Sequence, residues 1–303
     1  MILVDFNQVV IAAIAGQVGY DGKRGTGEVN EDFVRHLVIN MLRSYRRQYH
    51  AEYGELVICC DDGNYWRKVF FPQYKANRKK ERGESALDWQ VIFDSIKLLR
   101  DEINDNFPYP VIRVSRCEAD DVIATICKWS QSNELKQTGV IEEPQPILII
   151  STDGDLIQLQ KYSNVQQFSP RDKKMVTFPT GMNADKFILE HIIEGDTSDG
   201  VPNALSADNC LVDKIRQKPL TQARRAGFME NGIDGCLTDD ERTYFQRNTK
   251  LVDLSQIPAY IEDLILDMWQ QKLSYARALG RRKVFNYLIK HRMAELQKVL
   301  NDF

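Results

Sequence analysis

Long hydrophobic runs are missing from this chain of 303 residues. The apolar run nearest the N-terminus, residues 9–15, ends at Gly16, well short of the roughly 18 residues that a membrane-spanning helix requires. The first residues, Met-Ile-Leu-Val-Asp-Phe, contain neither the basic segment nor the cleavage site of a secretory signal. We therefore expect a protein of the cytoplasm that contacts no membrane.

Cysteine and histidine are also scarce. The six cysteines include no Cys-x-x-Cys pair, and the four histidines are scattered along the chain. This pattern disfavours a zinc site and a disulfide framework, and it favours free thiols in a reducing compartment. No Ser/His/Asp or Cys/His arrangement is recognisable that could supply a side-chain nucleophile.

A strong net charge is absent as well, because the chain carries a formal charge of only −3. The charges are nevertheless unevenly distributed: residues 67–82 hold seven basic residues and one acid, and residues 271–303 hold eight and two. Such runs are often merely solvated surfaces. Phe70, Phe71 and Tyr74 lie inside the first run, however, and interleaved aromatic rings favour stacking on unpaired bases. A basic surface around a concentrated acidic pocket is typical of a metal-dependent nuclease.

Short apolar runs that alternate with helical patterns predict an α/β fold, with a mostly parallel central sheet flanked by helices. The predicted strands are residues 2–4, 56–60, 111–114 and 147–150, and the predicted helices are residues 31–49, 85–103 and 118–129. An edge hairpin is predicted from residues 165–168 and 175–178. Beyond about residue 186 the pattern is helical. We therefore expect an α/β domain over residues 1–185 and a smaller helical domain over residues 186–303.

Carboxylates gather where the predicted strands end. Asp5, Asp61 and Asp153 follow three apolar strands, so parallel pairing would bring them to one edge of the sheet. Gly154 allows a tight turn, through which Asp155 can point to the same centre as Asp153. Five further acids form two short clusters: Glu118, Asp120, Asp121, Asp196 and Asp199.

Taken singly, these acids have ordinary explanations, such as a helix cap or complementation of a helix dipole. Together they are harder to explain, because crowding raises carboxylate pKa values and destabilises the fold unless cations neutralise the charge. Oxygen ligands without histidine or cysteine select Mg²⁺ or Mn²⁺. Two such ions about 4 Å apart can activate a water molecule and stabilise the leaving oxygen of a phosphodiester.

In their order along the chain, these motifs resemble those of the 5′ nuclease (flap endonuclease) family. They are Val-Asp5-Phe-Asn, Cys-Asp61 with Tyr-Trp-Arg67, Phe-Pro-x-Tyr74-Lys75-x-Asn-Arg78, Glu118-Ala-Asp120-Asp121, Ser-Thr-Asp153-Gly-Asp155 and Gly-Asp196-x-x-Asp199. The resemblance spans nearly the whole chain and is strongest over residues 1–200. It implies a divalent-metal-dependent 5′-to-3′ exonuclease and flap endonuclease that removes RNA primers and 5′ flaps during phage-type DNA replication.

The resemblance also implies residue roles and two Mg²⁺ ions, for which Mn²⁺ would substitute. The first ion would use Glu118, Asp120, Asp153 and Asp155, with Asp5, Asp61 and Asp121 nearby, and the second would use Asp155, Asp196 and Asp199. With the catalytic Asp153 and Asp155, Lys75 and Arg78 would steer the scissile phosphate. A basic arch at about residues 66–85 would bind nucleic acid through Arg67, Tyr74, Lys75, Arg78, Lys79 and Lys80. Within it, Tyr74 would stack on an end base.

One family feature is absent, because no Gly-x-Gly-x-Lys run of a helix-hairpin-helix follows Asp199. Lys214 and Arg216 could replace its phosphate contacts. The expected substrates are DNA and RNA–DNA hybrids with 5′ ends or flaps. The further expected partners are a single-stranded-DNA-binding protein and a sliding clamp, for a monomer in the host cytoplasm.

Two alternatives stay open. A single-strand ribonuclease of the PIN type is disfavoured by the chain length, the helical C-terminal region and the basic segment 67–82. A non-catalytic replication factor that binds branched DNA would have lost some of the nine carboxylates, all of which are present.

Overall fold

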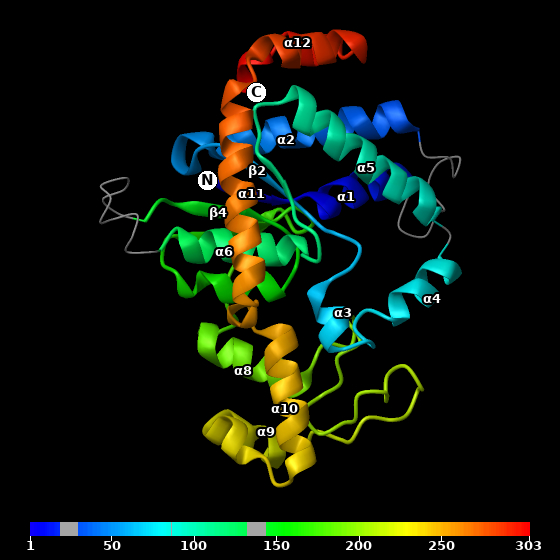
Figure 1. The fold of residues 1–303 in the computed structure, drawn as a ribbon, viewed down its shortest axis with the longest axis vertical. Coiled ribbons are helices and arrows are strands. Elements are labelled where there is room, and N and C mark those ends of the chain that lie inside the picture. The colour runs from blue at the N-terminus through cyan, green and yellow to red at the C-terminus, as the bar shows by residue number, and fades with distance from the viewer. Residues whose placement is uncertain (19–29, 86, 132–143) are drawn as a thin grey trace.

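The computed structural model describes residues 1–18, 30–85, 87–131 and 144–303. A six-stranded sheet lies at its centre, as Figure 1 illustrates. The strand order is β3-β2-β1-β4-β5-β6. Five strands are parallel: β1 (Ile2–Asp5), β2 (Leu56–Cys60), β3 (Val111–Arg113), β4 (Ile147–Ile150) and β5 (Val165–Ser169). The sixth, β6 (Lys174–Val176), pairs antiparallel with β5 at the edge. The predicted mostly parallel sheet and its edge hairpin are confirmed.

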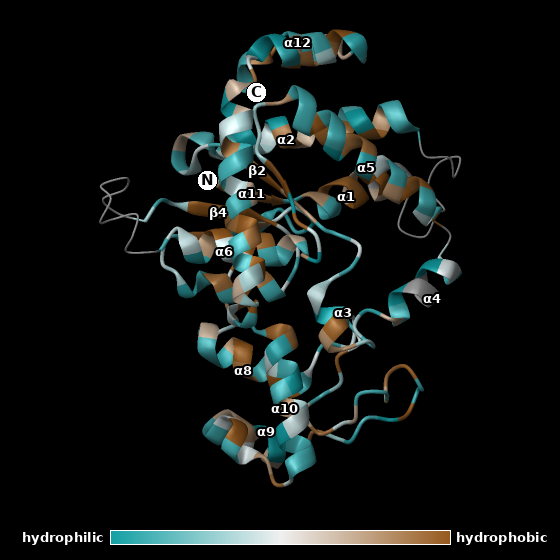
Figure 2. Cartoon of the chain, in the orientation of Figure 1, coloured by the Kyte–Doolittle hydropathy of each residue, from teal (hydrophilic) through white to brown (hydrophobic). Residues whose placement is uncertain are grey.

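Helices cover both faces of this sheet, because successive strand residues point to opposite sides. On one face, Val4, Ile58 and Ile150 pack in a hydrophobic core with four helices. These are α1 (Phe6–Val18), α2 (Glu31–Tyr53), α5 (Trp89–Asn106) and α12 (Arg281–Lys290). On the other face, Leu3 and Ile149 pack with α6 (Ala119–Trp129) and α11 (Ala259–Ala278). Figure 2 shows the hydrophobic residues concentrated in the strands and in α1 at the centre.

Three helices lie where the sequence pattern predicts none. Helix α1 starts directly after Asp5, so no loop separates it from the first strand. Its buried apolar residues are not confined to one narrow stripe, because Val9, Val10, Ala13, Ile14 and Ala15 are all buried. The basic arch contains α3 (Trp66–Phe70) and α4 (Asn77–Glu84). Helix α3 has only five residues, which is too short to show an apolar period, and α4 is too polar to show one.

The chain after residue 183 divides between two places. Helices α8 (Ala184–Glu194), α9 (Gln222–Asn231) and α10 (Asp239–Val252) surround a small separate core, whereas α11 and α12 pack on opposite faces of the sheet. The short helix α13 (Ala294–Gln297) follows α12. The division into two domains at residue 185 therefore stays a prediction. None of the described helices is long and apolar enough to cross a membrane.

Residues 203–220 contain neither helix nor strand, in contrast to the predicted helical pattern. Hydrogen bonds that involve side chains, rather than the backbone hydrogen bonds of a helix, hold this segment in place. The Asn203 backbone N–H donates to the Gln217 side chain at 2.7 Å, and the Asn203 amide donates to the carbonyl of Lys218 at 2.9 Å. Polar side chains that bond to nearby backbone compete with helix formation.

Candidate active site

The C-terminal ends of β1 and β4 place the first acids side by side. Asp5, the last residue of β1, is 7% exposed and accepts a hydrogen bond from Ser151 Oγ at 3.0 Å. Burial raises the pKa of Asp5 to about 7, and the neighbouring carboxylates of Asp61 and Asp153 add to the rise. Burial and the adjacent Asp155 raise the pKa of Asp153 to about 6. The predicted convergence of strand-end carboxylates is present.

The start of α6 brings a second group of acids to the same edge. Asp61 accepts a hydrogen bond from the backbone N–H of Ala119 at 2.7 Å, which ties the end of β2 to this helix. Asp120 accepts no hydrogen bond from any described residue. Burial, and then the charges of Asp153 and Asp5, raise the pKa of Asp120 well above its usual range. The charge of Lys75 opposes this rise, but Asp120 has no hydrogen-bond donor among the described residues.

Glu118 and Asp121 form the capping box of α6. Asp121 is fully buried, and its oxygens lie 2.8 Å from Arg67 Nη1, 3.2 Å from Trp66 Nε1 and 2.9 Å from the backbone N of Glu118. These contacts occupy both oxygens of Asp121, so it positions the helix start. Arg67 is 2% exposed and also bonds Glu118 at 2.9 Å and the Leu251 carbonyl at 3.1 Å. The prediction that Arg67 binds nucleic acid is wrong, because its guanidinium is buried among these partners.

The arch lies directly over the carboxylates. Lys75 forms an ion pair with Glu118 and lies 3.3 Å from Asp199, which Arg78 contacts at 2.5 Å. Burial favours the neutral form of Asp199, but Lys75 and Arg78 outweigh burial and hold the pKa of Asp199 below its usual value. Gly200 makes this approach possible: it has φ +76°, and a Cβ there would lie 2.9 Å from the carbonyl oxygen of Gln73.

Tyr74 does not lie where the sequence places it. Its ring is 5% exposed, and its hydroxyl donates to Asp199 at 2.9 Å and to Glu118 at 3.1 Å. The prediction that Tyr74 stacks on a base is wrong for this structure, because neither face of the ring is open. Phe71 is buried as well, whereas Phe70 is 45% exposed. Phe70 is the aromatic residue of this run that a base could reach.

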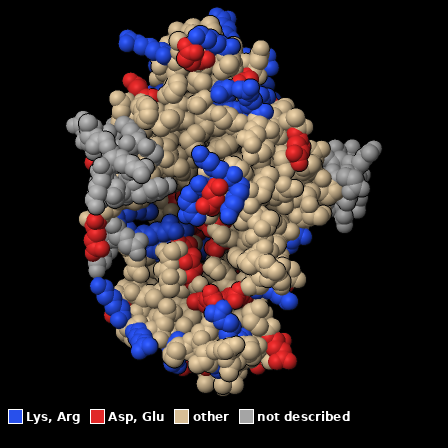
Figure 3. Space-filling view, turned by 180° about the vertical axis from the view of Figure 1, so that it is seen from behind, with Lys and Arg blue, Asp and Glu red and all other residues tan. Residues whose placement is uncertain are grey.

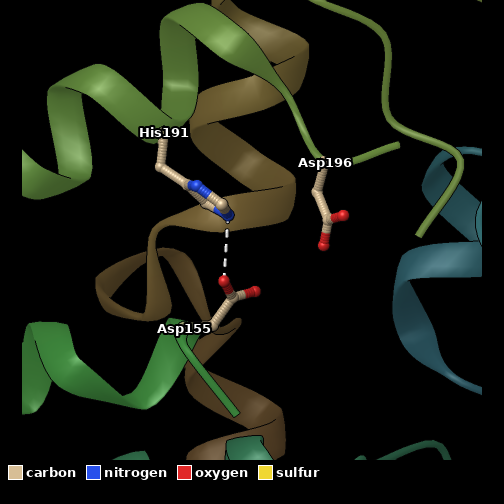
Figure 4. Close-up of side chains that lie close together, drawn as sticks. All are labelled: Asp155, His191 and Asp196. Carbon is tan, nitrogen blue, oxygen red and sulfur yellow. Dashed lines mark ion pairs between the residues drawn. The ribbon is translucent and has the colours of Figure 1, made fainter. Parts of the chain in front are cut away.

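A third group lies where η1 (Asp155–Lys161), the end of α8 and the following turn meet. Asp155, His191 and Asp196 offer ligand atoms that lie within 4.8 Å of one another (Figure 4). Burial disfavours the charged imidazole, but the Asp155 carboxylate outweighs burial and raises the pKa of His191. Asp196 Oδ1 accepts from the backbone and hydroxyl of Ser198 at 2.8 and 2.7 Å. The sequence pattern misses His191: it stands five residues before Asp196, and nothing in the sequence distinguishes it from the other scattered histidines.

The remaining predicted contacts lie on the surface or outside the described side chains. Lys214 and Arg216 are exposed in the irregular segment 203–220. The side chains of Lys79 and Lys80 fall outside the described part of the structure. Figure 3 shows acidic and basic side chains next to one another in a recess of the surface, the charge pattern of a site that holds cations and phosphate together.

Comparison with known families decides the class. Residues 3–187 match the 5′-3′ exonuclease N-terminal resolvase-like domain, and residues 182–303 match the C-terminal domain of T4 RNase H. The chain belongs to the 5′-3′ exonuclease family. It is therefore an enzyme of the nuclease class, a hydrolase of phosphodiester bonds, as the resemblance of its motifs predicts.

Individual relatives agree with membership of the 5′-3′ exonuclease family. The chain is 30% identical to Ribonuclease H of Enterobacteria phage T4 over 309 residues, which cover 99% of this chain and 95% of that protein. It is also 30% identical to DNA polymerase I of Rhizobium leguminosarum over 142 residues, 45% of this chain and 12% of that protein.

Two solved structures share the fold. The T5 D15 protein, co-crystallised with metal ions, has a TM-score of 0.61 at 19% identity, with 91% of this chain and 98% of that chain covered. A T5 5′-exonuclease mutant has a TM-score of 0.56 at 16% identity, with the same coverage. The predicted α/β fold of the 5′-3′ exonuclease family is therefore confirmed.

Proposed function

We propose that the protein is a Mg²⁺-dependent 5′-to-3′ exonuclease and flap endonuclease that removes RNA primers and 5′ flaps during phage-type DNA replication. The observation that carries the proposal is the convergence of acids from four parts of the chain beneath two cations of the arch, Lys75 and Arg78. Membership of the 5′-3′ exonuclease family supports the same reaction class.

The donor set fits divalent cations. Asp5, Asp120 and Asp153 are buried together: the charge of Asp153 raises the pKa of Asp5, and the charges of Asp153 and Asp5 raise that of Asp120. A divalent ion would relieve this repulsion. Carboxylate oxygens suit Mg²⁺, with Mn²⁺ as a substitute. We assign one ion to Glu118, Asp120, Asp153 and Asp155, and a second to Asp155, Asp196 and Asp199. When bound, the pair would activate a water molecule and stabilise the leaving oxygen.

The residues around these ligands have separate tasks. Asp5 accepts a hydrogen bond from Ser151, and Asp61 accepts one from the start of α6. These bonds help to hold β1, β4 and α6 in place, and both carboxylates add negative charge beside the ions. Lys75 and Arg78 neutralise Glu118 and Asp199 in this structure. We propose that the side chains of Lys75 and Arg78 leave these carboxylates and contact the scissile phosphate instead. Glu118 and Asp199 would then be free to bind the metal ions.

The rest of the substrate would lie outside this centre. Phe70 is exposed and Lys250 lies 5.0 Å over its ring, so base and backbone contacts can be made at one place. Lys214 and Arg216 would contact a duplex from the segment 203–220. We propose DNA and RNA–DNA hybrids with 5′ ends as substrates, a single-stranded-DNA-binding protein and a sliding clamp as partners, and a monomer that acts in the host cytoplasm.

A gel assay tests this function. A 5′-flap duplex and an RNA–DNA hybrid, each labelled at either end, are incubated with the full chain in Mg²⁺ and in EDTA. We expect Mg²⁺-dependent products that begin at the 5′ end, and the ratio of the two rates separates primer removal from flap trimming. Salt-sensitive binding without cleavage would instead indicate a non-catalytic branched-DNA factor. Cleavage of single-stranded RNA without a 5′-end requirement would indicate a PIN-type ribonuclease.

A further inference from the structure

His191 reaches the acidic centre from the last turn of α8. Its ring stacks on Phe187 with centroids 5.9 Å apart and planes within 10°, which fixes the direction of the imidazole. Figure 4 shows its side chain directed toward Asp155, with Asp196 beside them on the following turn. Two segments that are separate in the sequence, η1 and the end of α8 with its following turn, therefore place one nitrogen and two carboxylates around a common space.

The contact between His191 and Asp155 has the spacing of two ligands of one ion. Nε2 of His191 is buried and lies 2.9 Å from Oδ1 of Asp155, but it makes no hydrogen bond of acceptable geometry. Adjacent ligands of an octahedral ion with bonds of about 2.1 Å lie about 3 Å apart. On Asp196, the described residues donate only to Oδ1, so Oδ2 remains for an ion.

We propose that His191 is a metal ligand, and that the site formed by Asp155, His191 and Asp196 prefers Mn²⁺ to Mg²⁺. The inference rests on the proposed metal-dependent function and specifies one of its two ions. Mg²⁺ takes oxygen ligands almost exclusively, whereas an imidazole nitrogen is an ordinary ligand for first-row transition ions. A nitrogen donor in an otherwise oxygen-based site therefore raises the affinity for Mn²⁺ more than that for Mg²⁺.

The competing explanation is that His191 only orients Asp155 through an ion pair. The chain contains a matched example of such a pair, because Nε2 of His50 lies 2.9 Å from Oε1 of Glu55 on the exposed surface. That pair has the same separation as the pair at His191, yet it belongs to no group of potential metal ligands among the described residues. His50→Gln is therefore the control for His191→Gln.

Pulsed electron paramagnetic resonance of Mn²⁺ bound to the full chain tests the inference without substrate. We expect coupling to a directly bound histidine nitrogen in the wild type and in His50→Gln, and loss of that coupling in His191→Gln. Labelling histidine with ¹⁵N in the wild type identifies the nitrogen even if His191→Gln does not fold. Calorimetry should show that His191→Gln weakens Mn²⁺ binding about tenfold or more, while Mg²⁺ binding changes much less.

Four results would overturn the inference. If bound Mn²⁺ shows only oxygen ligands, or if its nitrogen coupling survives in His191→Gln, His191 is not a ligand, although a metal-dependent nuclease remains supported. An equal loss of Mn²⁺ and Mg²⁺ affinity in His191→Gln would refute the preference for Mn²⁺. If the wild type binds neither Mn²⁺ nor Mg²⁺, the proposed function fails together with the inference.

Discussion

Lys75 Nζ lies 3.3 Å from Oδ2 of Asp199 and also forms an ion pair with Glu118, so one lysine joins acids from two ends of the centre. Asp199 belongs to the turn after α8, and Glu118 caps the start of α6. The backbone N–H of Lys75 donates to the carbonyl of Asp199 at 2.7 Å as well. The arch and the acidic turn are therefore fixed to each other by both backbone and side chain.

Replacing Lys75 should affect turnover more than substrate affinity. If Lys75 contacts the scissile phosphate most strongly in the transition state, Lys75→Ala should lower kcat about 100-fold and leave KM within a few-fold. Single-turnover cleavage of the flap duplex, together with equilibrium binding in Ca²⁺, separates the two effects. Weaker binding with an unchanged rate would show that Lys75 only positions the backbone.

Asp153→Asn should abolish cleavage and preserve folding and DNA binding. The substitution keeps the size of the side chain but removes a ligand charge, and metal-assisted hydrolysis depends on several kcal/mol of such stabilisation, about 10³-fold in rate. Cleavage is measured beside fluorescence anisotropy of a labelled flap. Asp185→Asn, on the exposed first turn of α8, is the control and should cleave normally. Full activity of Asp153→Asn would remove Asp153 from the metal centre.

The sequence predicts the sheet and the carboxylates well, because both depend on short-range patterns. Apolar runs that end in Asp5 or just before Asp61 define strand ends, and parallel pairing then brings the acids together. Partners at long range are not encoded in any such pattern. Arg67 lies in a basic run, yet it forms buried ion pairs with Glu118 and Asp121. His191 contacts Asp155, which lies far from it in the sequence. Sequence spacing alone therefore assigned Arg67 wrongly to nucleic-acid binding and missed His191 at the acidic centre.

Arg67→Met should strongly destabilise the protein. Arg67 is a buried cation between Glu118 and Asp121, and its loss would leave the buried Asp121 without its cation and Glu118 with Lys75 alone. Removing one side of a buried ion pair typically costs about 3–5 kcal/mol. Arg113→Met is the control, since Arg113 is 46% exposed in its pair with Asp62 at 2.6 Å and should cost about 1 kcal/mol or less. Urea unfolding in EDTA measures both, and similar losses would contradict the central role of Arg67.

Asp5→Asn should stabilise the metal-free protein in a pH-dependent way. The pKa of Asp5 is raised to about 7 in the folded state, against about 3.9 in an unfolded chain. The folded state therefore disfavours the charged form. This cost is absent below about pH 4, grows as the pH rises, and is complete above about pH 7.

The variant lacks this charge, so in EDTA at pH 8 it should unfold at a higher temperature than the wild type. The difference, of the order of a few kcal/mol in the free energy of unfolding, should shrink as the pH falls to 4. Saturating Mg²⁺ should also reduce it, because bound cations relieve the same repulsion in the wild type. Thermal unfolding from pH 4 to 8 measures the effect, with the exposed Asp185→Asn as the control. A difference independent of pH would show that Asp5 acts through packing, and that its charge is not opposed in the folded state.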